Sequence, residues 1–225
     1  MKRRVLIMLT LGRDSFSSNG NLIEPIPELI VGDILVLGRL GDVFLGNFEC
    51  TGKLIVEPGT NLNADYLSTT GGLAIGGGNV ESGVVLVDGD VSVVENIVVH
   101  RRLHSKGSLV CTGSARSFGG QIRVSKSFKC DGEIFAVSDI VVGGHLESLR
   151  KIEAGFDIYV LGGGIRAQHS IKAYAGIWVA GDIDTPLVSC SYVKVAGRIH
   201  PRCYVDANRI YRDWKPSRAV RESDR

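Results

Sequence analysis

Histidine, cysteine and closely spaced aspartate are the residue types in this sequence that could do chemistry. The five histidines are His100, His104, His145, His169 and His200. They could hold a metal only if several converged on one point. His100 and His104 are the closest pair in sequence, yet along an extended strand they would lie about 13 Å apart, too far for one zinc ion. We therefore expect solvated imidazoles, no metal site and no cofactor.

Two pairs of aspartates could act as general acid and base in a glycan-cleaving enzyme. Asp88 and Asp90 stand in VDGDV, and Asp182 and Asp184 stand in GDIDT. Aspartate beside glycine is also the ordinary composition of a tight turn, and we prefer that interpretation. The stretch GGLAIGGGNV (residues 71–80) lacks the Lys-Ser/Thr pair and the helix of a phosphate loop. With no nucleophile signature present, the sequence predicts no catalytic residue.

An internal repeat determines how these side chains are positioned. Apolar residues recur at steps of 18 or 19 residues along most of the chain, and such a period indicates a stack of similar turns. The anchors are Ile30, Phe48, Leu67, Val85, Leu103, Ile122, Ile140, Ile158 and Ile177. A composition of 44% hydrophobic and 22% charged residues excludes a disordered chain.

Each repeat reads as three short strands separated by tight corners. Further apolar residues follow the anchor by two, six and about twelve positions, in the period of strands. Glycine follows the anchor by four positions in seven repeats, at Gly52, Gly71, Gly89, Gly107, Gly144, Gly162 and Gly181. We expect these glycines to turn the first corner with a positive φ. The sequence thus predicts an all-β fold, a single-stranded β-solenoid of about nine stacked turns, right-handed because the third run slips in its spacing.

The repeat also predicts which side chains become neighbours. Asp90 and Asp182 share one corner position but lie five turns apart, so they cannot form one site. Cys111 and Cys130 each follow an anchor by eight residues in consecutive turns, so they should stack in the core as small apolar residues. The five cysteines show no paired spacing, which favours free thiols and a reducing compartment.

An aromatic pair is expected on the outer surface. Tyr159 and Trp178 each follow an anchor by one residue in adjacent turns, so their rings should stack there. Exposed aromatic rings of this kind are a candidate contact for another subunit or for the C-terminal segment.

The two ends of the chain lack the repeat. We expect an N-terminal cap over residues 1–29, the solenoid over 30–200, and a cap with a frayed tail over 201–225. In the last segment we expect a short helix or coil, with Asp206 as the N-cap of a helix that lays Ile210, Tyr211 and Trp214 over the last turn.

The N-terminal apolar run is too short for a signal peptide or a membrane-spanning helix. The run Val5–Leu11 is followed at once by Arg13 and Asp14. We expect a cytoplasmic protein, with membrane contact through residues 1–11 as a weaker alternative.

Short aliphatic strands that alternate with Gly or Gly-Asp corners make residues 31–199 resemble the bactofilins, a family of bacterial cytoskeletal proteins. The similar stretches are GKLIVEPG, VVLVDGDV, GEIFAV and GIWVAGDI. The resemblance implies a right-handed β-helix that serves as a non-catalytic, self-associating scaffold.

Charge is distributed unevenly although the formal net charge is only +2. Between residues 31 and 95 there are nine acidic residues and two basic ones, Arg39 and Lys53. Residues 96–130 contain no acid and seven bases, here called the basic belt: Arg101, Arg102, Lys106, Arg116, Arg123, Lys126 and Lys129. The belt could pair with the acidic part of a neighbouring rod or bind an anionic polymer such as nucleic acid.

The sequence therefore predicts a non-catalytic structural or scaffold protein that self-associates or presents a solenoid face to another protein. The partner-binding candidates are the basic belt, Tyr159 and Trp178. Two alternatives stay open: a carbohydrate-active β-helix enzyme, and a binder of an anionic polymer through the belt.

Overall fold

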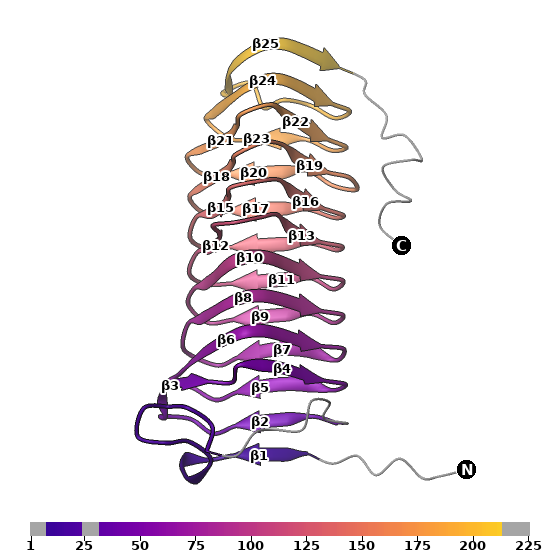
Figure 1. Ribbon diagram of the computed structural model, residues 1–225. Helices are drawn as coiled ribbons and strands as arrows, with labels where there is room; N and C mark the ends of the chain where they lie inside the picture. The colour runs from indigo at the N-terminus through magenta and orange to yellow at the C-terminus, as the bar shows by residue number, and fades with distance from the viewer. Residues whose placement is uncertain (1–7, 24–31, 213–225) are drawn as a thin grey trace, which may run out of the picture.

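The computed structural model describes residues 8–23 and 32–212. Within them the chain coils into one β-solenoid of about 10 turns of about 18 residues, which confirms the predicted fold class (Figure 1). Strands of successive turns pair in parallel, so each turn is hydrogen-bonded to the turn before and the turn after.

One face of the rod is a ten-stranded sheet of short strands. Its strands are β1 (Leu9–Leu11), β2 (Ile34–Val36), β5 (Lys53–Val56), β7 (Gly72–Ile75), β9 (Val91–Val93), β11 (Leu109–Cys111), β14 (Phe128–Cys130), β17 (Leu146–Ser148), β20 (Ile165–Ala167) and β23 (Ile183–Asp184).

A 15-stranded sheet covers the other two faces. Its short strands are β3 (Gly41–Phe44), β4 (Asn47–Cys50), β12 (Ala115–Ser117), β13 (Ile122–Val124), β15 (Ile134–Ala136), β16 (Ile140–Val142), β18 (Lys151–Ala154), β19 (Ile158–Val160), β21 (Ser170–Ala173) and β22 (Gly176–Val179). Its long strands are β6 (Thr60–Thr69), β8 (Val80–Val87), β10 (Ile97–Ser105), β24 (Leu187–Val195) and β25 (Tyr204–Arg212). The long strands run through the corner at which the other turns break into two strands, and they join both faces into one sheet.

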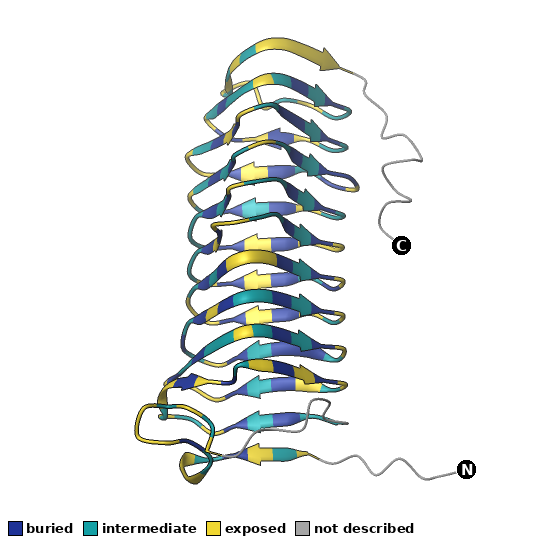
Figure 2. Cartoon of the chain, viewed as in Figure 1, coloured by how far each residue is buried: buried dark blue, intermediate teal, exposed yellow. Residues whose placement is uncertain are grey.

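The predicted anchors form a single buried column. From Phe48 to Ile177 each anchor is the Cα partner of the next one along the chain. All eight are at most 2% exposed, and Figure 2 shows buried positions recurring at the same places in successive turns along the middle of the rod. Ile30 lies outside the described residues. Burying a side chain of this size contributes about 1.5–3 kcal/mol, so the column is a main source of the fold's stability.

The corner glycines are needed for a different reason than the one predicted. None of the seven has a positive φ. Instead, a Cβ at Gly89 would lie 2.4 Å from the carbonyl oxygen of Gly71, and a Cβ at Gly71 would lie 2.5 Å from the carbonyl carbon of Gly52. Successive turns therefore approach so closely at this corner that the backbone leaves no room for a side chain.

The predicted C-terminal helix is wrong. Residues 204–212 form strand β25, which pairs in parallel with β24 at eight positions. Ile210 lies opposite Val193, which itself continues the anchor column from Ile177. The edge of β24 offers a hydrogen-bonding template that outweighs the local helix signal at Asp206. Trp214, which was expected to cover the last turn, lies outside the described residues.

The N-terminal segment contributes one strand to the stack. β1 pairs with β2, and a loop with the 3₁₀ turn η1 (Arg13–Ser15) follows it. No helix in the part of the chain that the structure describes is long and apolar enough to cross a membrane.

Candidate functional site

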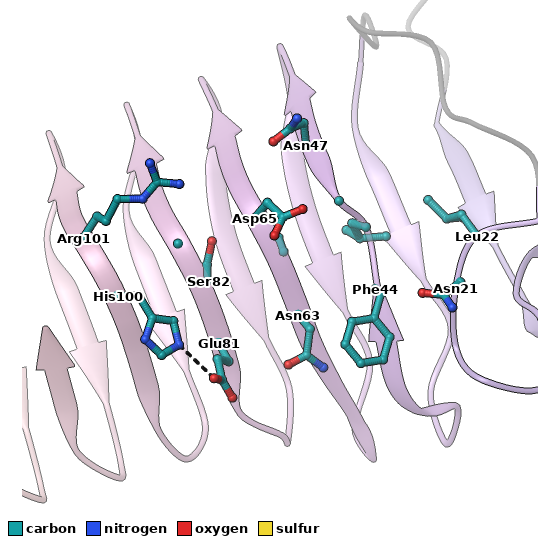
Figure 3. Close-up of a pocket in the computed structure, with 14 residues that line it drawn as sticks. Asn21, Leu22, Phe44, Asn47, Asn63, Asp65, Glu81, Ser82, His100 and Arg101 are labelled. Carbon is teal, nitrogen blue, oxygen red and sulfur yellow. Dashed lines mark hydrogen bonds and ion pairs between the residues drawn. The ribbon is translucent and has the colours of Figure 1, made fainter. Parts of the chain in front are cut away.

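A polar groove of about 700 Å³ lies in the N-terminal half of the rod (Figure 3). Strands β6, β8 and β10 form its floor where they run through the corner of the solenoid. The loop at Asn21 and Leu22 walls one end. That loop is held by hydrogen bonding because the amide of Phe44 donates to the carbonyl of Gly20.

A row of four different side chains runs along the groove, parallel to the rod axis. Phe44, Asn63 and Glu81 occupy one register position in three successive turns, and His100 stands beside Glu81 (Figure 3). The imidazole Nε2 of His100 lies 2.9 Å from Oε1 of Glu81, and both side chains are more than half exposed. The row therefore offers an aromatic face, an amide, a carboxylate and an imidazole to one elongated ligand.

A β-bulge shapes the groove next to this row. Between Val99 and Arg102 strand β10 contains one residue more than β8, so the pairing register shifts there. The bulge places Arg101 opposite Gly83, where a Cβ would lie 3.3 Å from the Arg101 guanidinium and 2.3 Å from the carbonyl oxygen of Asp65. Because Gly83 has no side chain, it leaves room for the Arg101 side chain to lie over the groove floor.

Among the described residues that line the groove, none forms an assembled nucleophile. Ser82 lines it but is buried, and its hydroxyl donates to the carbonyl of Val84. Asp88 and Asp90, the acid–base candidates of the enzyme alternative, are not among the residues that line the groove. The side chains that line the groove can form hydrogen bonds to a polar ligand.

The predicted aromatic pair is present near the C-terminal end of the rod. The rings of Tyr159 and Trp178 stack with centroids 4.3 Å apart and 13° between their planes. The next two side chains at the same position are Lys194 and Tyr211. The Lys194 ammonium lies 5.9 Å from the Trp178 ring and 5.5 Å from the Tyr211 ring. We call Tyr159, Trp178, Lys194 and Tyr211 the aromatic–cation column.

Hydrogen bonds fix the lower end of this column. The Tyr159 hydroxyl donates to Oδ2 of Asp157, whose Oδ1 accepts the amide of Gly176. Burial raises the pKa of the Asp157 carboxyl, and burial together with the nearby Asp157 charge raises the pKa of Tyr159. Gly176 leaves room for the ring of Tyr192, since a Cβ there would lie 2.4 Å from that ring. Tyr192 in turn contacts Trp178 edge-on at 4.8 Å.

The structure does not bring the basic belt together on one face. Arg101, Arg102 and Arg116 belong to β10 and β12, Arg123 to β13, and Lys129 to β14, while Lys106 and Lys126 follow strands at a corner. Within the belt, Lys106 pairs with Asp88 at 3.0 Å and Arg116 pairs with Glu133 at 3.2 Å. The belt encircles the rod instead of forming a stripe along it.

Two corner aspartates accept hydrogen bonds from the next turn of the solenoid. Oδ1 of Asp90 accepts the amide of Ser108, and Oδ1 of Asp182 accepts the amide of Arg198, each at 2.7 Å. Asp184 pairs with Arg166. These carboxylates join neighbouring turns.

The histidines fall at separate places. His145 accepts the amide of Gly164 through Nδ1, and His104 lies on β10. Burial lowers the pKa of His104 below its ordinary value, and the charges of Arg123, Lys106 and Arg102 lower it further. No group of three or more metal-binding side chains occurs within residues 8–23 and 32–212.

Comparison of the chain with protein-family models, curated proteins and solved structures found no match.

The sequence pattern did not predict two features: the upper half of the aromatic–cation column and the polar groove. Lys194 and Tyr211 were not predicted because each follows an anchor, Val193 or Ile210, that comes fewer than 18 residues after the previous one. The groove was not predicted because its register shift comes from one extra residue in β10, and this residue does not alter the regular spacing of the anchors.

Proposed function

We propose that this protein is a non-catalytic scaffold that self-associates through the C-terminal end of its solenoid. The observation that carries the proposal is strand β25. It pairs with β24 along one edge, and no strand among the described residues pairs with its other edge. An open strand edge is a template for a strand of another chain.

The side chains of β25 support this role. Tyr204, Ile210 and Tyr211 are all exposed, which places apolar surface beside the unpaired edge. Lys194 and Trp178 continue that surface along the rod. Aromatic side chains are enriched in protein interfaces, so the aromatic–cation column extends the proposed contact from the end of the rod onto its side.

The experiment is sedimentation equilibrium of the purified chain and of Ile210→Lys. A lysine on an edge strand opposes pairing with another chain, and Ile210 is exposed enough to change without loss of the fold. We expect the substitution to weaken association roughly tenfold, about 1.4 kcal/mol.

Val137→Lys is the matched control. Val137 is as exposed as Ile210 but lies in the middle of the rod. Equal association of the chain and both variants would remove the proposal, as would a monomer at every concentration.

The resemblance to bactofilins and a cytoplasmic location belong to the same proposal. A solenoid that assembles end to end fits a cytoskeletal role. Free cysteines throughout the chain fit a reducing compartment.

A second function is favoured by the polar groove. We propose that it binds a hydroxyl-rich ligand such as an oligosaccharide. Asn63, Glu81 and His100 supply donors and acceptors in planar groups, and Phe44 supplies a partly exposed ring at one end of the row. A long anionic ligand fits less well because Glu81 and Asp65 both line the groove.

Titration calorimetry with a panel of neutral oligosaccharides tests this second proposal. Asn63→Ala and Glu81→Gln should each weaken binding about tenfold or more, because the first removes a hydrogen-bonding amide and the second replaces a charged carboxylate acceptor with an amide donor. Glu153→Gln is the control, since Glu153 occupies the same register position three turns beyond the groove. Release of reducing ends would indicate the enzyme alternative, whereas no heat with any glycan would remove both.

A further inference from the structure

Two cysteines meet in the core at the middle of the rod. Cys111 ends β11, Cys130 ends β14, and the two are direct Cα partners in adjacent turns. Both are fully buried, and their Sγ atoms lie 2.8 Å apart. Non-bonded heavy atoms normally rest at about 3.5–4.0 Å, so the sulfurs are closer than ordinary packing requires.

The backbone geometry suits a covalent bond between them. Neighbouring strands lie about 4.8 Å apart, inside the Cα separation of about 4.4–6.8 Å that disulfides use. The positions before and after the pair in the same column are Val93 and Ser148, so neither thiol has another cysteine as a neighbour in its sheet.

Hydrogen bonding orients the reduced thiols toward each other. The Cys111 thiol donates to Sγ of Cys130, whose own thiol donates to the carbonyl of Gly113 at 2.8 Å. This arrangement lowers the pKa of Cys130 and raises that of Cys111. Burial raises the pKa of the other three cysteines, that of Cys190 to about 12.

We propose that Cys111 and Cys130 form an intramolecular disulfide that clips two successive turns of the solenoid when a disulfide oxidant such as glutathione disulfide is present. The thiolate of Cys130 attacks one sulfur of the oxidant and releases one glutathione thiolate. The thiolate of Cys111 then attacks Sγ of Cys130 and releases the second. Two protein thiols lose their protons, and one oxidant molecule is reduced to two thiols.

The position of the pair gives the bond a mechanical consequence. In a solenoid each turn contacts only its neighbours, so unfolding that starts at one end spreads turn by turn. A bond between β11 and β14 closes a loop of one turn near the middle of the chain and blocks that spread. We expect a rise in melting temperature of roughly 5–10 °C. In a reducing compartment the pair stays reduced, and this inference does not depend on the proposed self-association.

Refolding in a redox buffer gives the test, because the thiols are accessible before the turns close. The chain is unfolded in urea with reductant, refolded with oxidised and reduced glutathione, and digested with trypsin. Tryptic cleavage separates the two cysteines into GSLVCTGSAR (residues 107–116) and CDGEIFAVSDIVVGGHLESLR (residues 130–150). We expect these two peptides joined and two hydrogen atoms lighter than their sum, and the rise in melting temperature lost on reduction.

Cys111→Ser and Cys130→Ser are matched controls. Serine already occupies the next position of this column at Ser148, where its hydroxyl donates to the carbonyl of Gly132 much as Cys130 donates to that of Gly113. Both variants should refold without the linked peptides and without the rise. Free thiols at both positions in the refolded wild-type chain, or linkage of Cys111 to Cys50, Cys190 or Cys203, would overturn the inference.

Discussion

The ring of Trp178 lies flat against the ring of Tyr159 one turn below it, with centroids 4.3 Å apart. Their stacking follows from the solenoid itself, because equivalent positions in adjacent turns bring side chains into direct register. The same register adds Lys194 above the indole, so three consecutive turns are joined by side chains on their outer surface as well as by their backbones.

Removal of the indole should destabilise the C-terminal turns. Trp178→Ala loses the stack on Tyr159, the edge contact with Tyr192 and the buried part of the ring. We expect a loss of about 2–3 kcal/mol in the free energy of unfolding, measured by urea denaturation. Tyr174→Ala is the control because Tyr174 is 80% exposed, and it should change stability by less than about 0.5 kcal/mol. Equal effects of the two substitutions would contradict a structural role for the stack.

Lys194 should contribute through its charge above the rings. A double-mutant cycle of Lys194→Met and Trp178→Leu isolates the interaction between these two side chains. We expect a coupling energy of about 0.5–1 kcal/mol, since the ammonium lies near the ring at a partly exposed position. A coupling energy of zero within error would mean that the contact between Lys194 and the indole does not stabilise the fold.

The solenoid could be predicted from the sequence because each turn repeats the same pattern of short apolar strands and glycine corners. Phe128 and Leu146, or Tyr159 and Trp178, become neighbours through spacing alone. The end of the chain was mispredicted because local signals at Asp206 favour a helix, whereas the edge of β24 favours a strand. The groove could not be predicted, since one extra residue at the bulge near Arg101 redirects side chains without changing the pattern of apolar residues.

The corner glycines give a sharp test of why glycine is required. Gly89→Ala should cost roughly 1–3 kcal/mol, because its Cβ would press on the carbonyl oxygen of Gly71 in the preceding turn. Gly77→Ala is the matched control: its Cβ would make only ordinary contacts with Pro58 and Gly59, at 3.4 Å and beyond. We expect the control to change stability by no more than about 0.5 kcal/mol in thermal or urea denaturation. A harmless Gly89→Ala would show that the corner has space to relax.

Stability should fall in mild acid because of His104. Burial and the cations of Arg123, Lys106 and Arg102 lower its pKa in the folded chain below the ordinary value of 6.5, although Asp88 opposes them. The unfolded chain therefore binds a proton more readily, and stability is lost as pH falls through 6.5 toward the folded pKa. Urea denaturation of the chain and of His104→Gln between pH 8 and pH 5 should give a shallower loss for the variant. Identical pH profiles would remove His104 as the cause.

The central claim is that rods of this protein join through the end that carries β25. Electron microscopy of the purified chain at increasing concentration tests it most directly. We predict particles that lengthen along the rod axis in whole multiples of one solenoid, and single rods for Ile210→Lys at the same concentration. Single rods of the unaltered chain at every concentration, or assemblies joined only along their sides, would contradict the claim.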